Sequence, residues 1–563
     1  MKGSNKDFDK AIMTKYSISK QFFIKRTHHI SMMRINEIIK EYYLLFLVFY
    51  FTSANAQDIN NYRCLLKDST VKIEKTNLPI VFISVGKKMI QYEDYILAQM
   101  KIIYNGEGEY NYGDTILHPN QLVDYEGCIA LRYRGHSSFI NSDKKPYAFR
   151  TLKDAKLPSE GGKKEKVSLL GMRKDSKWAF LAPWADRSMI RDVLSFELAR
   201  PWMDFVPETR FCELILDGTY YGVFILTERV SSGKNRLNLS DSNDIGKEGE
   251  TDILVYVDRG DAPYYQSNFH PYGANGIVMD KTVKYEYKFP DPKDFSVLPL
   301  ETNYYIDREI NRMEEVFATG AYEKYKDVID VTSFIDYMLS TEVSNNIDGY
   351  RLSTYLYKYS PSTARKEGYS EKWKMALWDF NFAWGNTKYN GHVSNTIWHY
   401  NINFREDYQN DLNWVPFYWH KMLKDDKYVS LLKLRWKQYR ISNHSIIAIY
   451  NKIDSLTNIL VTGGGISRNE NAWRIFDTSI WGVGYNVESY EEEISHLKRW
   501  IEGRLEFMDK ELIDATGIKE IELSDGSVEL YNFQGVKLKE IPRNKPYIIK
   551  DKGKSRIIIP HIN

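Results

Sequence analysis

The sequence predicts a mixed α+β fold, because the type of residue pattern changes twice along the chain. β-Branched and alternating segments dominate the first half, helical periodicity takes over from about residue 328, and short strand-like segments return after residue 518. Hydrophobic residues make up 43% and charged residues 27% of the 563 residues, as in ordinary globular proteins of several domains. We therefore expect a β-rich region, a helical region and a small β module, in that order.

Several strands can be placed in the first half. The β-branched run at residues 78–85 and the alternating run at residues 129–133 read as strands, and residues 146–152 as the strand that follows a polar loop. The clearest hairpin joins residues 211–216 to residues 219–227 through Asp217-Gly218. That dipeptide suits a type I′ turn, in which both central residues take positive φ.

Three helices are indicated. Residues 186–200 carry apolar residues at helical spacing, with Asp186 as the N-cap and Pro201 as the stop. From residue 328 the apolar residues again follow helical spacing, and Phe334 and Tyr337 are expected in the core. A long helix with one apolar stripe is expected over residues 487–513.

The first 56 residues are expected to be a leader and not part of the fold. Residues 42–51 form an uninterrupted apolar run of ten, which has the length of a signal-peptide core and is too short to span a bilayer. Ala54-Asn55-Ala56 follows and fits a cleavage site, so export with cleavage near Ala56 is predicted. The alternative is a buried apolar helix at the N-terminus. No other long apolar run occurs, so no transmembrane anchor is expected in the mature chain.

Charge and cysteine content exclude some classes of protein. A net charge of +2 gives no general attraction to nucleic acid, and no nucleic-acid partner is expected. The three cysteines, Cys64, Cys128 and Cys212, match no zinc pattern and allow at most one disulfide. We expect Cys212 to be a packed strand residue.

Two aspartates are candidates for chemistry. Asp348 lies in a loop between a helix and an expected strand at residues 354–358, where it can orient a hydroxyl proton or simply make an Asx-turn. Asp379 ends an apolar strand at residues 373–378 among aromatic residues, and a magnesium ion or an arginine would offset its charge equally well. Phosphoryl transfer needs one aspartate at the acceptor hydroxyl and another on the metal, and this pair has that layout.

A third candidate is the loop Arg134-Gly135-His136-Ser137-Ser138, with Lys144-Lys145-Pro146-Tyr147 behind it. Its glycine, serines and cations suit a bound phosphate, although an ordinary charged hairpin end would look the same. Walker, G-x-G-x-x-G, His-Glu-x-x-His and G-x-S-x-G motifs are not found in the sequence.

Taken in order, these segments resemble the CotH-type (spore coat protein H) kinases and their exported bacterial relatives. The pieces that carry the resemblance, between about residues 75 and 512, are Arg134–Ser138, Lys145–Tyr147, Arg191-Asp192, Tyr220–Glu228, Asn346–Asp348 and Trp378–Gly385. The resemblance implies an atypical protein-kinase-like fold with two lobes, a β-rich small lobe and a helical large lobe. It also implies ATP with Mg²⁺ or Mn²⁺ as cofactors and Ser or Thr of proteins as acceptors.

The resemblance also implies site residues. Asp348 would be the catalytic base, and Asp379 would bind the metal with Asn346 as a neutral second ligand. Arg134, Gly135, Ser137 and Ser138 would cover the phosphates, and Glu228 would lie at the hinge beside the adenine. Lys145 and Arg150 are both candidates for the small-lobe cation.

Some residues depart from the family pattern. His136 stands where Asn is common, Asn381 where a second Asp is frequent, and Ser353 where kinases in general have Asn. A non-catalytic surface, adhesion or coat scaffold on the same fold (a pseudokinase) is therefore the alternative function. A carbohydrate-active protein is a third, but no paired carboxylates support it.

These interpretations divide the chain into five parts. They are the leader (1–56), an N-terminal β-rich segment (57–125), a small-lobe-like nucleotide-binding region (126–310), a helical large lobe with both aspartates (311–515) and a C-terminal β tail (516–563). The tail resembles the short β tails of exported Bacteroidetes proteins, which implies a possible sorting role.

Overall fold

The computed structural model describes residues 66–240, 249–273, 278–295, 298–389, 394–405 and 413–513, with four further strands between residues 528 and 558. The predicted leader and Cys64 lie outside the described residues. The described part is a mixed α+β protein, as the sequence predicted. None of its helices has both the length and the apolar character needed to cross a membrane.

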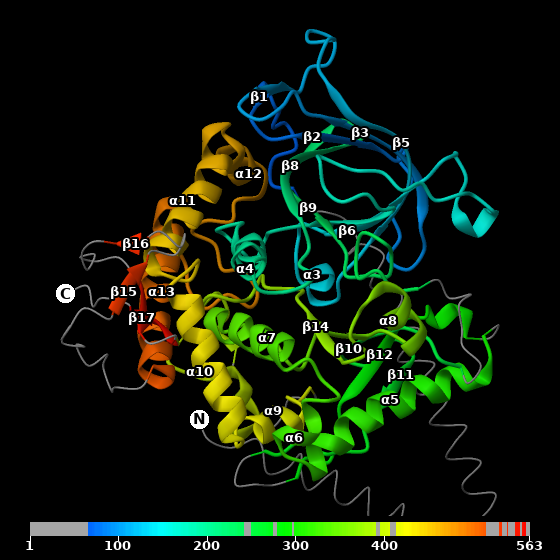
Figure 1. Ribbon diagram of the computed structural model, residues 1–563. Coiled ribbons are helices and arrows are strands. Elements are labelled where there is room, and N and C mark those ends of the chain that lie inside the picture. Colours follow the sequence, from blue (N-terminus) through cyan, green and yellow to red (C-terminus); the bar gives the residue numbers. More distant parts are fainter. Residues whose placement is uncertain are drawn as a thin grey trace, which may run out of the picture. The chain divides into compact units, whose positions relative to one another are not determined.

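The first half of the described chain forms a closed barrel (Figure 1). Neighbouring strands in it run antiparallel, except that β2 lies parallel to β8. In barrel order the strands are β2 Ile80–Ser84, β3 Ile96–Ile103, β5 Val123–Tyr133, β6 Tyr147–Thr151, β7 Lys177–Leu181, β9 Thr219–Glu228 and β8 Thr209–Leu216. Outside the barrel, β1 Lys75–Thr76 pairs with β4 Asn111–Tyr112. Closure leaves no free edge among the barrel strands.

The predicted hairpin is confirmed. Strands β8 and β9 meet at Leu216 and Thr219, and the turn residues Asp217 and Gly218 have φ of 45° and 81°. Cys212 is fully buried in β8, as expected, and Cys128 in β5 is a free thiol like Cys212.

A second, five-stranded antiparallel sheet has the order β11-β12-β10-β13-β14. Its strands are β10 Ile253–Val257, β11 Tyr264–Gln266, β12 Lys284–Phe289, β13 Thr354–Lys358 and β14 Lys374–Ala376. The last two are the strands that the sequence predicted between Asp348 and Asp379. β13 pairs with β10, about 100 residues earlier in the chain, which joins segments from both sides of residue 310 in one sheet.

Helices make up most of the remainder. They are α3 Ser137–Ile140, α4 Arg191–Ala199, α5 Leu300–Thr319, α6 Tyr322–Tyr325, α7 Val331–Ser344, α8 Pro361–Glu367, α9 Phe417–Met422, α10 Asp426–Arg440, α11 Ile446–Thr462, α12 Gly465–Trp473 and α13 Tyr490–Leu512. Short 3₁₀ helices are η1 Pro158–Glu160, η3 Pro292–Asp294 and η5 His399–Phe404. A four-stranded sheet follows, with β15 Val528–Tyr531, β16 Lys537–Leu538, β17 Tyr547–Asp551 and β18 Lys554–Ile558.

The prediction that a helix begins at Asp186 was wrong, because α4 begins five residues later. The Asp186 carboxylate accepts hydrogen bonds from the backbone N–H groups of Ser188 (3.1 Å) and Arg191 (2.9 Å), which closes a turn before the helix. The Arg191 guanidinium also donates to it (2.6 Å), so a local ion pair holds this turn.

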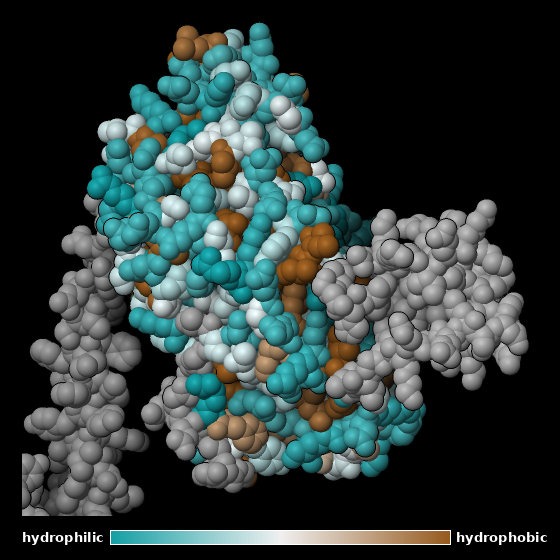
Figure 2. Space-filling view, turned by 90° about the vertical axis from the view of Figure 1, so that its left-hand side faces the viewer, coloured by the Kyte–Doolittle hydropathy of each residue, from teal (hydrophilic) through white to brown (hydrophobic). Residues whose placement is uncertain are grey.

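The core is apolar and strongly aromatic. Phe334 and Tyr337 of α7 are buried as predicted, and α13 buries the stripe that includes Leu497, Ile501 and Leu505. Figure 2 shows one face of the protein, on which hydrophilic side chains predominate and hydrophobic ones gather in narrow strips. Burial of apolar surface is therefore the main stabilising contribution.

Candidate active site

A cavity of about 680 Å³ is lined by residues of β5, the β7–α4 segment, β10, β12 and the loops on either side of β13 and β14. Asp348 and Asp379 both line it, and so do Arg134, Gly135, Ser137 and Ser138. The tertiary structure therefore brings six of the predicted site residues to one cavity. Their arrangement follows from how each loop is held.

The loop of Asp348 follows a helix end that is fixed by a buried network. Asn345, with φ of 46°, ends α7, and the buried carboxylate of Glu342 one turn earlier accepts from the backbone N–H groups of His399 and Tyr400 (both 2.9 Å). The Tyr350 hydroxyl donates to the same carboxylate (2.9 Å). These bonds leave the Asp348 side chain 24% exposed, with the Arg351 guanidinium 3.7 Å from its carboxylate. Asp348 is thus accessible from the cavity on a rigid support.

Asp379 comes just after β14 in a left-handed conformation, with φ of 67°. The Asn346 side-chain amide donates to its backbone carbonyl (2.9 Å), while the Asn346 side-chain oxygen accepts the Asp348 N–H (3.3 Å). Asn346 therefore ties the two aspartate loops together. Asn346 itself does not line the cavity.

The surroundings of Asp379 disfavour the negative charge of its carboxylate. Burial and the neighbouring Asp348 and Asp258 carboxylates raise the pKa of Asp379 to about 6, against the opposing effect of Arg134 and Arg259. A carboxylate whose charge is disfavoured by burial and by like charges gains most from a positive ligand.

Asp192 is a cavity residue that the sequence reasoning did not select. It lies in the first turn of α4, and one of its oxygens accepts the backbone N–H of Phe380 (2.6 Å). Burial and Asp379 raise the pKa of Asp192 to about 8. Asp192 thus fixes the segment just after Asp379. Its only sequence signal was its place in the Arg191-Asp192 pair.

The loop of Arg134 meets these carboxylates from the barrel. The Arg134 guanidinium lies 5.1 Å from the Trp378 ring centre, beside Asp379 in the sequence. Burial and Arg229 lower the pKa of Arg134, whereas Asp379 and Asp192 raise it, so its charge is within range of both aspartates. Gly135 has φ of 81°, and a Cβ there would lie 2.2 Å from Oγ of Ser138. Glycine is required for this close loop.

Comparison with known protein families gives a match to the CotH kinase protein family over residues 131–508, which is more than half of the chain. The chain belongs to this family. A comparison with curated proteins gave no match.

The CotH match contains the whole cavity apart from Tyr92. Besides Asn346, it also contains three predicted site residues that lie outside the cavity lining. Lys145 is buried, and its ammonium donates to the backbone carbonyl of Phe139 (2.6 Å). Arg150 in β6 places its guanidinium 5.2 Å from the Tyr95 ring centre. Neither residue lines the cavity that Asp348 and Asp379 share.

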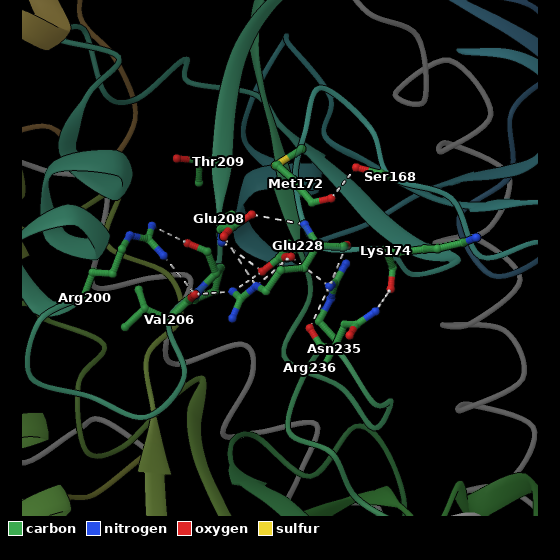
Figure 3. A network of polar contacts seen from close by, with 12 residues as sticks. Ser168, Met172, Lys174, Arg200, Val206, Glu208, Thr209, Glu228, Asn235 and Arg236 are labelled. Carbon is green, nitrogen blue, oxygen red and sulfur yellow. Dashed lines mark hydrogen bonds and ion pairs between the residues drawn. The ribbon is translucent and has the colours of Figure 1, made fainter. Parts of the chain in front are cut away.

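Glu228, the third, belongs to a buried network of polar contacts (Figure 3). Arg173 forms an ion pair with its carboxylate, Arg236 donates to it (2.8 Å), and so does the backbone N–H of Glu208 (3.0 Å). Burial raises the pKa of Glu228, against the opposing effect of the two arginines. The network satisfies Glu228 within the fold.

A magnesium ion that arrives with a nucleotide would need few ligands from the protein. Within the described residues, no three His, Cys, Asp or Glu side chains are placed together as ligands. Mg²⁺ bound with nucleotides commonly takes only one or two protein carboxylates, and phosphate oxygens and water supply the rest. Asp379, with its raised pKa, provides a carboxylate of that kind.

Proposed function

We propose that this CotH-family protein is an ATP-dependent protein kinase that transfers the γ-phosphate of ATP to Ser or Thr hydroxyls of surface or envelope proteins. The observation that carries the proposal is the placing of Asp348 and Asp379 at one cavity, with their loops joined through Asn346. Phosphoryl transfer is catalysed mainly by positioning and charge stabilisation, so two carboxylates on rigid supports meet its main requirement.

Each residue has a distinct role in this proposal. Asp348 accepts the hydrogen bond of the acceptor hydroxyl and then its proton, and Arg351 holds the carboxylate in place. Asp379 binds Mg²⁺ or Mn²⁺, which when bound neutralises charge on the phosphates. Backbone N–H groups and side chains of the Arg134–Ser138 loop cover the phosphates.

We also propose that the protein acts outside the cytoplasm, after cleavage near Ala56. The support is the apolar run at residues 42–51 with the small residues that follow it. An N-terminal sequence determination on protein secreted by a bacterial host would show Gln57 as the first residue. An intact leader on the exported protein would contradict the proposal.

A non-catalytic scaffold is the second candidate, and Asn381 favours it. This residue lines the cavity where related kinases frequently have a second aspartate, so one ligand charge is missing. A pseudokinase would keep the cavity without turnover.

Phosphate transfer decides between the two candidates. The purified protein is incubated with radiolabelled ATP and Mg²⁺ or Mn²⁺, beside Asp348→Ala, Asp379→Ala and the control Asp261→Ala. Asp261 is an exposed carboxylate at the rim of the same cavity. Label is expected in the wild type and in Asp261→Ala, and a loss of about 100-fold or more in the other two variants.

Two results would contradict this expectation. Equal label in all four proteins would remove Asp348 and Asp379 from the active site. Complete absence of label, together with a stabilising thermal shift by ATP and Mg²⁺, would favour the scaffold.

A further inference from the structure

Two cations that line the cavity form no ion pair with a carboxylate of the described residues. Arg229, just after β9, and Lys288, in β12, both line the cavity. The neighbouring cations Arg259 and Arg351 pair with Asp258 and Asp348. Neither Arg229 nor Lys288 forms an ion pair with any described residue. Both side chains are half-buried, and a cation that has lost part of its hydration is costly unless a counter-ion approaches it.

The carboxylates closest to Lys288 are already bound to other donors. Glu286 accepts the backbone N–H groups of Gly260 (2.7 Å) and Asp261 (3.0 Å), and the Tyr256 hydroxyl donates to its other oxygen. Asp258 accepts the N–H groups of Arg259 (2.9 Å) and Ser353 (3.2 Å). The Lys288 ammonium instead lies 4.1 Å from the Tyr256 ring centre.

Two further arginines lie close together on neighbouring barrel strands. Arg132 in β5 and Arg150 in β6 each place a guanidinium 5.2 Å from the Tyr95 ring centre. The Nε atoms of both arginines are buried without a hydrogen-bond partner. Of the two, only Arg132 lines the cavity; its guanidinium donates to the backbone carbonyl of Tyr92 (2.8 Å) and forms no ion pair with a described residue.

The titration of nearby groups agrees with a concentrated positive field. Burial and Arg229 lower the pKa of Lys288 to about 8, although Glu286 and Asp258 oppose the shift. Burial alone would raise the pKa of Tyr95, yet Arg229, Arg150 and Arg132 bring it down to about 8. The field therefore favours negative charge beside these cations.

We propose that Arg229 and Lys288, together with Arg134, bind the phosphate oxygens of the nucleotide. This assignment rests on the proposed kinase function. Arg134, Arg229 and Lys288 line the same cavity as Asp379, so a ligand in that cavity meets both the carboxylate and the cations. A metal-bound triphosphate carries both complementary charges, a cation for the carboxylate and phosphate oxygens for the arginines and the lysine.

The alternative anion is a phosphorylated side chain of a protein partner. The nucleotide is preferred because Arg229 and Lys288 lie in the same cavity as Asp379, which carries the metal in the proposed reaction. Lys145 and Arg150, the two cations expected from the sequence, do not line this cavity. Arg150 instead contacts the ring of Tyr95 and helps to lower the pKa of Tyr95.

Calorimetric titration of the full chain tests the assignment with four probes: ATP, inorganic tripolyphosphate, adenosine and a phosphoserine dodecapeptide. The variants are Arg229→Gln and Lys288→Met, with Lys288→Arg as the conservative change and exposed Lys163→Met as the matched control. Loss of one charge-assisted hydrogen bond is expected to weaken ATP and tripolyphosphate about tenfold or more. Adenosine binding stays unchanged, Lys163→Met behaves as the wild type, and Lys288→Arg restores most of the affinity.

The outcomes separate this inference from the kinase proposal. ATP and tripolyphosphate affinities that are unchanged in folded Arg229→Gln and Lys288→Met overturn the inference, while labelled phosphate transfer by those variants leaves the kinase intact. Preferential binding of the phosphoserine peptide through these residues also overturns it. Tripolyphosphate binding that depends on both residues, in a wild type that transfers no phosphate, supports the inference and rejects the kinase.

Discussion

At the scale of single residues, Asp379 holds a charge that the fold itself opposes. Its positive φ and its raised pKa both indicate that the position is maintained for a purpose other than stability. The fold also opposes the charge of Asp192, because the pKa of Asp192 is raised further while its carboxyl group fixes Phe380. The proposed binding of a metal ion at Asp379 would offset this cost.

Removal of the Asp379 charge is therefore expected to stabilise the protein while abolishing activity. With the pKa of Asp379 raised from 3.8 to about 6, the folded protein is destabilised by ionisation. The cost is absent below about pH 4, grows as the pH rises towards 6, and is complete above it. Asp379→Asn should thus raise the free energy of unfolding by roughly 2–3 kcal/mol at pH 7 and by little at pH 4.

Urea unfolding of the wild type and of Asp379→Asn at both pH values measures this difference. Saturating Mg²⁺ with ATP should reduce the advantage of the variant, because the cation binds the ionised carboxylate. A variant that is less stable than the wild type at pH 7 would show that Asp379 has a structural role.

At the scale of elements, the loop before α3 depends on one glycine. Gly135 and Gly218 both have φ of 81°, but only Gly135 has a close neighbour, because a Cβ added there would lie 2.2 Å from Oγ of Ser138. Gly218 has open space around it. The two glycines thus form a matched pair in which backbone strain is equal and crowding differs.

Alanine at either glycine should cost about 1 kcal/mol of unfolding free energy through the left-handed backbone. Gly135→Ala should in addition displace Ser138 and weaken ATP binding several-fold, whereas Gly218→Ala should leave ATP affinity unchanged. Denaturant unfolding and ATP titration of both variants give the two quantities. Equal ATP affinity in the two variants would remove the loop from the nucleotide site.

At the scale of the whole molecule, a buried ion network connects the site to the last long helix. Arg191 has no exposed side-chain area, and it donates to Asp186 (2.6 Å), to Glu493 of α13 (2.7 Å) and to the backbone carbonyl of Ala383 (3.1 Å). The segment after Asp379 is therefore held by residues more than 100 positions away on either side. Deletion of one charge leaves another buried without its partner.

Glu493→Ala is accordingly expected to lower the free energy of unfolding by about 3–5 kcal/mol. The control is Glu491→Ala, an exposed glutamate in the same first turn of α13, which should change it by less than about 0.5 kcal/mol. Chemical unfolding of both variants measures the effect. Similar stabilities would mean that the network contributes little to the fold.

The sequence by itself determined the local features of this protein. Asp217-Gly218 has its preferred turn, the two strands between Asp348 and Asp379 lie where the sequence predicted them, and α13 follows its apolar stripe, because each depends on nearby residues. The two aspartates were found for the same reason, since each lies where a strand or helix ends.

Only the tertiary structure decided which charges meet. Glu228 was expected beside the nucleotide, yet Arg173, 55 residues away, forms an ion pair with it. The residues next to Asp192 and Lys288 in the sequence did not indicate a site. Lys288 reaches the cavity because its strand, β12, pairs with β10, which in turn pairs with β13. Compensation of a buried charge depends on distance in space, and sequence spacing does not contain that distance.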